Sequence, residues 1–81
     1  RSRYELDVDG SIALAAYERD GDRIMFTHTE VPEALAGRGI ASRLIEGALA
    51  DVRSRGLKVV PLCPFVRRYI EKHPETADLL A

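Results

Sequence analysis

The chain of 81 residues lacks tryptophan, carries one cysteine and has no long hydrophobic run. Cys63 cannot form an internal disulfide, so we expect a free thiol and a cytoplasmic location. The apolar runs fall far short of the ~20 residues that a membrane span requires, which predicts no membrane association. The two histidines stand apart from each other and from the cysteine, and this spacing predicts no metal site.

An excess of charge of either sign is also missing. Twelve basic and thirteen acidic side chains give a formal net charge of −1. Proteins that neutralise nucleic-acid phosphates usually show a basic stripe, so no nucleic-acid partner is expected. The densest basic group, Arg67, Arg68 and Lys72, is expected on the solvated face of a helix.

The length allows a single domain over residues 1–81. Nothing in the sequence fixes the oligomeric state, and we expect a monomer or a weak dimer. The frequent use of arginine, alanine and leucine would suit a bacterial source.

The first third of the chain predicts a three-stranded antiparallel meander. Tyr4, Leu6 and Val8 alternate with acidic residues, as in a half-buried strand. Asp9-Gly10 is a strong signal for a two-residue hairpin. The return strand is expected over 11–18.

One face of that return strand should hold Ile12, Leu14 and Ala16. After a turn at 19–22, the third strand is expected from Arg23 to Val31 and closes at Pro32. Strict alternation along it predicts that Ile24, Phe26, His28 and Glu30 share one face.

The period then changes to that of an amphipathic helix. The helical stripe consists of Ile40, Leu44, Ile45, Ala48, Leu49 and Val52. Gly56 is typical of a helix C-terminus. A short strand is expected over 57–62, and a last helix from about Pro64 to His73-Pro74.

The predicted order is therefore β-β-β-α-β-α, an α/β (α+β) fold in which the meander is followed by a β-α-β crossover and a C-terminal helix. A right-handed crossover makes the third and fourth strands parallel. Both strands then end at the edge where the long helix begins. Ligands of open α/β sheets tend to bind at that edge.

The turn at this edge is Gly37-Arg38-Gly39-Ile40-Ala41-Ser42. Two glycines allow a tight turn and a close approach of a ligand to the backbone. The amides of 38–42 would be unsatisfied donors at the positive end of the helix dipole, which favours phosphate. The segment is neither a Walker loop nor a three-glycine dinucleotide fingerprint. A plain structural turn is the alternative.

Residues 36–41 resemble the pyrophosphate loop of the GNAT acyltransferases, Arg/Gln-x-x-Gly-x-Gly/Ala. Gly39 and Ala41 match this pattern, whereas Ala36 departs from it. Segments 26–32 and 59–66 resemble a small subgroup of that superfamily, so that the resemblance covers about residues 23–80. It implies a GNAT-like core in which the third and fourth strands splay apart, with Pro61 suited to the opening.

The resemblance further implies an acetyltransferase that uses acetyl-CoA (or another acyl form of coenzyme A) and acts on an amine of a small molecule or protein. The residues that it places at the cofactor are Val31, Gly37, Arg38, Gly39, Ile40, Ala41 and Ser42. A coenzyme A-binding module without efficient catalysis is the first alternative, because the pattern shows neither helices before the second strand nor the terminal strands that complete acceptor pockets in larger relatives. An interaction domain with a purely structural glycine turn is the second.

Three residues are candidates for catalysis, and each has a structural alternative. Cys63 would be the N-cap of the last helix, where the helix end favours a thiolate. It would then act as a nucleophile or lie close to the transferred acyl carbon; otherwise it is a small buried residue. His28 could take a proton from the attacking amine, with Glu30 as another candidate base. Tyr69 could protonate the departing thiolate or simply pack. His73, before Pro74, is expected only to cap the helix end or to form the turn.

Overall fold

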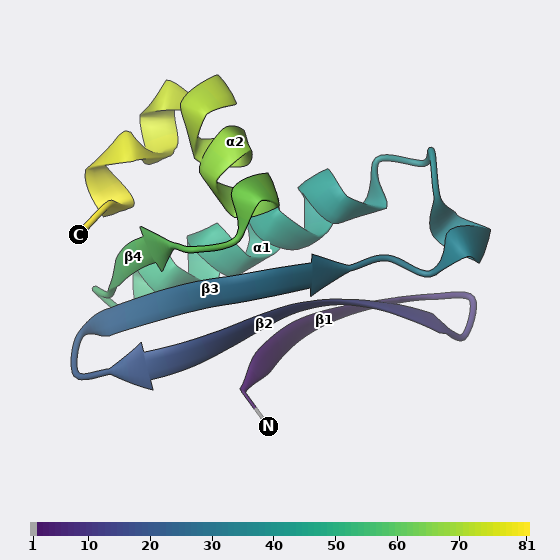
Figure 1. Ribbon diagram of the computed structural model, residues 1–81, viewed down its shortest axis with the longest axis horizontal. Helices are drawn as coiled ribbons and strands as arrows, with labels where there is room; N and C mark the ends of the chain where they lie inside the picture. The colour runs from purple at the N-terminus through teal and green to yellow at the C-terminus, as the bar shows by residue number, and fades with distance from the viewer. Residues whose placement is uncertain (1) are drawn as a thin grey trace.

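The computed structural model describes residues 2–81 and shows one four-stranded sheet. The strands are β1 (Arg3–Val8), β2 (Ser11–Asp20), β3 (Arg23–Glu30) and β4 (Lys58–Pro61). The first three form the antiparallel meander, and β4 pairs with β3 in parallel. The sheet order β1-β2-β3-β4 and the mixed α+β fold therefore confirm the sequence prediction (Figure 1).

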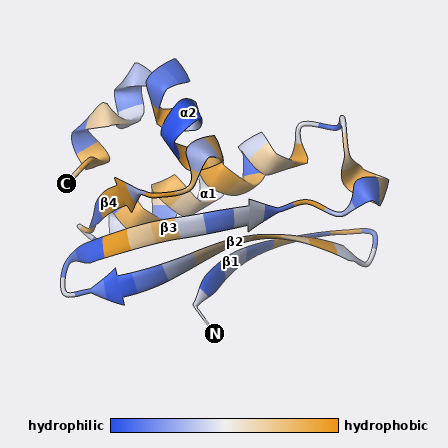
Figure 2. Ribbon diagram, in the orientation of Figure 1, coloured by the Kyte–Doolittle hydropathy of each residue, from blue (hydrophilic) through white to orange (hydrophobic). Residues whose placement is uncertain are grey.

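Helix α1 (Ile40–Ser54) buries the predicted stripe against the sheet, and it contacts all four strands. Helix α2 (Pro64–Lys72) packs on β3 and β4 and begins at the expected proline. Figure 2 shows hydrophobic residues along β4 and in the adjoining part of α1, while much of α2 is hydrophilic. One continuous hydrophobic core results. Within residues 2–81, no helix is long and apolar enough to cross a membrane.

Two 3₁₀-helices complete the fold. The sequence does not indicate η1 (Glu33–Leu35), which carries Leu35 into the core. The second, η2 (Pro74–Leu79), follows α2 as one more short helical segment. Its end pairs with β4, because Leu80 forms a parallel bridge with Val59. The C-terminal segment thus covers the outer edge of β4.

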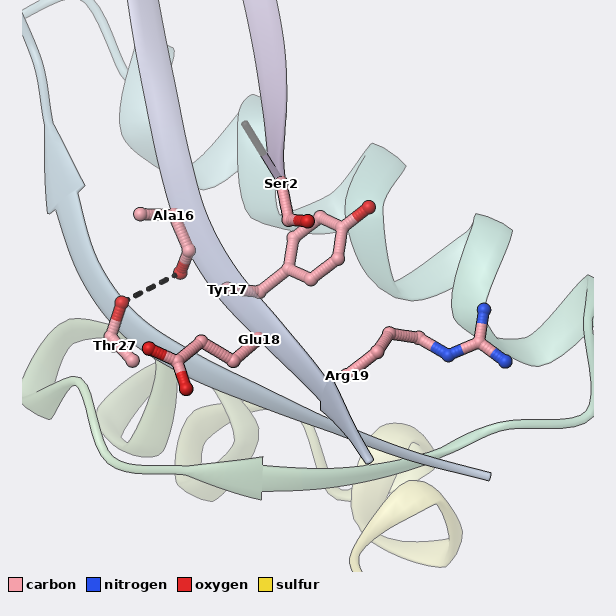
Figure 3. Close-up of a pocket in the computed structure, with 6 residues that line it drawn as sticks. All are labelled: Ser2, Ala16, Tyr17, Glu18, Arg19 and Thr27. Atoms are coloured by element: carbon pink, nitrogen blue, oxygen red, sulfur yellow. Dashed lines mark hydrogen bonds between the residues drawn. The ribbon is translucent and has the colours of Figure 1, made fainter. Parts of the chain in front are cut away.

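An irregularity in β3 changes which side chains face the core. Ala16 of β2 pairs with His28, but the next residue, Tyr17, pairs with Phe26, so Thr27 is an extra residue in β3. The Thr27 hydroxyl donates a hydrogen bond of 3.3 Å to the Ala16 carbonyl oxygen (Figure 3). Such a β-bulge reverses the alternation of side chains.

The predicted facing of His28 is therefore wrong. Ile24 and Phe26 are buried, whereas His28 and Glu30 lie beyond the bulge on the open face of the sheet. A uniform period of two cannot represent an extra residue, which arises from the pairing with β2.

The buried face of the return strand β2 is also not the one that hydrophobicity suggests. Ile12, Leu14 and Ala16 do share a face, as expected, but it is the open one, where Ile12 is 43% exposed. The buried residues are Ala13 and Ala15, both 0% exposed. Their small side chains let α1 lie close to the sheet.

Candidate functional site

The parallel pairing of β3 and β4 ends early. The last pair is Phe26 with Pro61, while β3 continues to Glu30. The amide of Cys63 donates a 2.8 Å hydrogen bond to the Phe26 carbonyl oxygen, and the chain then turns into α2. Among residues 2–81, no strand pairs with β3 on this side beyond Phe26. The two strands separate here, as the resemblance implied, and they leave a length of strand edge open.

A cavity of about 270 Å³ lies beside this opening, at the N-terminus of α1. Gly37 (φ 78°) and Gly39 (φ 71°) adopt left-handed conformations that form its tight turn. Six of the seven residues predicted to hold the cofactor line the cavity, and Arg38 does not. The lining consists of Val31, Leu35, Ala36, Gly37, Gly39, Ile40, Ala41, Ser42 and Phe65.

The helix end at this cavity is suited to an anion. Gly39 is the N-cap of α1 and offers no capping side chain, and the first turn has no acidic residue. The amides of the first turn cannot bond within the helix, and the helix dipole makes this end positive. Phosphate oxygens would satisfy these donors. The chemistry of the site thus fits a pyrophosphate group.

A second cavity of about 160 Å³ adjoins the first, since Ser42 and Phe65 line both. Its other lining residues are Arg68, Tyr69 and Lys72 of α2. The sequence predicted Arg68 and Lys72 only as a solvated helix face. Their spacing of four residues, on the side of the helix that also holds Phe65 and Tyr69, is the signal that could have placed them at a site.

Cys63 is the N-cap of α2, as predicted, and is buried at 4% exposure. Its sulfur lies 3.4 Å from the hydroxyl oxygen of Thr29 on β3. Thr29 was not among the predicted site residues. Without the bulge its side chain would face away from the core, so local alternation could not indicate this contact.

His28 and Glu30 lie at the same end of β3 but on the opposite face. His28 Nε2 and Glu30 Oε2 are 2.7 Å apart, and both side chains are largely exposed. With the proton on Nε2, this hydrogen bond leaves Nδ1 free to accept another proton. The structure therefore places the predicted base and Cys63 on the two sides of one strand.

Tyr69 lies farther along α2, where it is buried to 9% exposure and stacks on His73 at 3.9 Å. Burial raises the pKa of Tyr69, and the carboxylates of Glu46 and Glu75 raise it further. His73 Nδ1 donates to the Tyr69 carbonyl oxygen at 2.8 Å, consistent with a role at the helix end. Within residues 2–81, no hydrogen bond joins Tyr69 to His28 or Cys63.

Comparison with known sequences identifies the family. A family model of the GCN5-related N-acetyl-transferase matches residues 3–79, nearly the whole chain. The chain belongs to this family.

Relatives of this GCN5-related domain occur in vertebrates. The NATD1 proteins of chicken and human are each 41% identical to this chain over 63 residues, which cover 76% of it. NATD1 of zebrafish is 32% identical over 77 residues, or 91% of this chain and 70% of that protein. The chain spans 57% of chicken NATD1, little more than half its length.

A solved structure agrees with the fold. The NMR structure of a GCN5-like protein from Staphylococcus aureus matches all of this chain and 82% of its own, with a TM-score of 0.79 and 24% sequence identity. The GNAT fold predicted from the sequence is thereby confirmed.

A larger cavity of this GCN5-related domain lies elsewhere. It has a volume of about 520 Å³ and follows β2 beyond the start of β1 (Figure 3). Its lining consists of Ser2, Ala16, Tyr17, Glu18, Arg19 and Thr27, and none of the predicted site residues is among them. We therefore place the site at the smaller cavity by α1, which the predicted residues line. Among residues 2–81, no group of ligating side chains could hold a metal ion.

Proposed function

We propose that this chain binds acetyl-coenzyme A and transfers its acetyl group to an amine. The observation that carries the proposal is the uncapped N-terminus of α1, which opens into a cavity beside the unpaired end of β3. A pyrophosphate and an extended amide-bearing arm need these two features side by side. An isolated structural turn needs neither.

Each part of the site has a role in binding. The amides of residues 39–42 would hold the pyrophosphate, and the open edge of β3 would pair with the amides of the pantetheine arm. Arg68 and Lys72 line the adjoining cavity and would attract the negative charge of the cofactor phosphates.

When bound, acetyl-coenzyme A supplies the activated acetyl thioester. His28, oriented by Glu30, takes the proton that the amine nitrogen loses as it accepts the acetyl group. Tyr69 remains the candidate that returns a proton to the departing sulfur, although burial raises the pKa of its hydroxyl and so makes it a weaker acid. Cys63, beside Thr29, borders the gap through which the thioester would reach the open face.

A coenzyme A-binding module without efficient catalysis is the second candidate. It is favoured by the separation of His28 and Cys63 on the two faces of β3 and by the buried state of the cysteine. The two functions share the cofactor site and differ in turnover alone. Release of free thiol from acetyl-coenzyme A plus an amine, dependent on the protein, distinguishes them.

Native mass spectrometry with acetyl-coenzyme A, together with thermal unfolding, tests the shared site. We expect a non-covalent adduct and a melting temperature that rises with ligand concentration. Adenosine diphosphate is the control, since it carries the pyrophosphate without the pantetheine arm and should stabilise less. The absence of both adduct and stabilisation at millimolar coenzyme A would refute the proposal.

A further inference from the structure

A second groove, remote from the cofactor cavity, lies between α1 and the edge strand β1. It has a volume of about 400 Å³. The strand contributes Tyr4, Glu5 and Leu6, and the helix contributes Arg43, Leu44, Gly47, Ala48 and Asp51. Because β1 is at the end of the sheet, the groove faces outward.

Gly47 stands in the middle of α1, where glycine destabilises a helix relative to alanine. Its φ is not positive, and a Cβ atom at this position would meet nothing within 4 Å. No contact inside the described chain therefore requires glycine. A glycine on an exposed helix surface does, however, permit the close approach of another backbone.

The charges on either side of Gly47 are arranged symmetrically. Arg43, Gly47 and Asp51 follow at intervals of four residues and line the same groove. If a second α1 crosses antiparallel at Gly47, Arg43 of each helix comes level with Asp51 of the other. Such self-complementarity is what a two-fold interface requires.

Both side chains can make these contacts. Within residues 2–81, Arg43 has no ion pair. Asp51 uses Oδ2 for Tyr4 and Arg55, at 2.6 and 2.8 Å, and its Oδ1 atom remains for a further donor.

We propose that this groove is the interface of a homodimer, in which two α1 helices cross antiparallel at Gly47 and are joined by two Arg43–Asp51 ion pairs. The occupant of each groove is a second copy of the chain, which covers the half-buried side chains of Tyr4 and Leu6. The inference does not depend on the proposed function.

Sedimentation velocity over a dilution series tests the dimer, with Gly47→Leu as the first variant. The monomer has space for a leucine, which also favours a helix, so the variant should fold and its isolated subunit should unfold at a higher temperature. The dimer dissociation constant should rise about tenfold or more, because the helices can no longer approach. A wild-type chain that stays monomeric at millimolar concentration overturns the proposal.

A charge exchange tests the orientation of the two helices. Arg43→Glu makes both members of each proposed ion pair acidic, and Asp51→Lys makes both members basic, so each variant alone should dimerise weakly. A mixture of the two should form heterodimers, because opposite charges then meet. Circular dichroism checks that each variant is folded, since Asp51 also bonds to Tyr4. If Asp51→Lys unfolds, Arg43→Ala replaces it in the test. Arg43→Ala should weaken the dimer less than Arg43→Glu does. If neither Gly47→Leu nor Arg43→Glu changes the dimer dissociation constant, the dimer forms through another surface and the inference is wrong.

Discussion

The hydroxyl oxygen of Thr29 lies 3.4 Å from the sulfur of Cys63, and this contact joins the end of β3 to the first turn of α2 across 34 residues of sequence. It lies where β4 has already separated from β3. Thr29 reaches the core side there because Thr27 is an extra residue in the strand. The bulge thus puts a hydroxyl and a thiol on one side of β3, and the His28–Glu30 pair on the other.

Cys63→Ala should separate binding from turnover. If the thiol borders the path of the acetyl group, we expect turnover to fall roughly tenfold or more with little change in coenzyme A affinity. Thr29→Val keeps the shape but removes the hydroxyl, and should have a smaller effect. Intact-protein mass spectrometry after denaturation shows whether the thiol carries an acetyl group. Full activity of Cys63→Ala would leave the cysteine as a packing residue.

His28→Ala should reduce turnover by roughly a hundredfold or more, the usual contribution of a general base, and leave coenzyme A binding intact. Glu30→Gln should cause a smaller loss, because the amide still accepts the imidazole hydrogen bond without the negative charge. Glu18→Gln, which alters an exposed carboxylate of β2, is the matched control and should be silent. Thiol release measured at several amine concentrations provides the comparison. Equal losses in Glu18→Gln and Glu30→Gln would point to a general charge effect.

Ala41→Glu should weaken coenzyme A binding about tenfold or more, because it adds a carboxylate where the pyrophosphate would lie. The same change should not unfold the chain, since an acidic residue in the first turn favours a helix. Ala50→Glu places the same residue on the exposed part of α1 away from this cavity and should bind normally. Calorimetric titration with coenzyme A measures the affinity of each variant. Equal affinities in the two variants would contradict the placement of the pyrophosphate at this loop.

Stability at high pH should depend on Tyr4. Burial raises the pKa of Tyr4, and the hydrogen bond to Asp51 raises it further. The unfolded chain loses this proton near pH 10.0, whereas the folded chain holds it to higher pH. The stabilisation is therefore complete below pH 10 and is lost as the pH rises through the folded-state value.

Urea unfolding at a series of pH values above 10 should show a decline in the free energy of unfolding for the wild type. The decline should be shallower in Tyr4→Phe, which has no proton to lose. Tyr17→Phe is the control and should keep the wild-type decline. Parallel curves for wild type and Tyr4→Phe would contradict the assignment.

Local patterns were sufficient for the order of elements and for much of the cofactor cavity. The stripe from Ile40 to Val52 has the helical period, and a helix that follows Gly37 and Gly39 must begin with unsatisfied amides wherever it lies. Pro64 likewise fixed the start of α2, and hence Cys63 at its N-cap. These features depend on neighbours along the chain, which is why the sequence by itself determined them.

The tertiary structure decided the features that depend on partners distant in sequence. The bulge at Thr27 arises from pairing with Ala16, and it turned His28 to the open face and Thr29 to the core. The buried face of β2 was decided in the same way, by the close packing of α1 on small alanines. Arg68 and Lys72 became part of a cavity only when α2 packed beside Ser42 of α1. Alternation and helical period show which side chains share a face, but only the packed partners determine what that face meets.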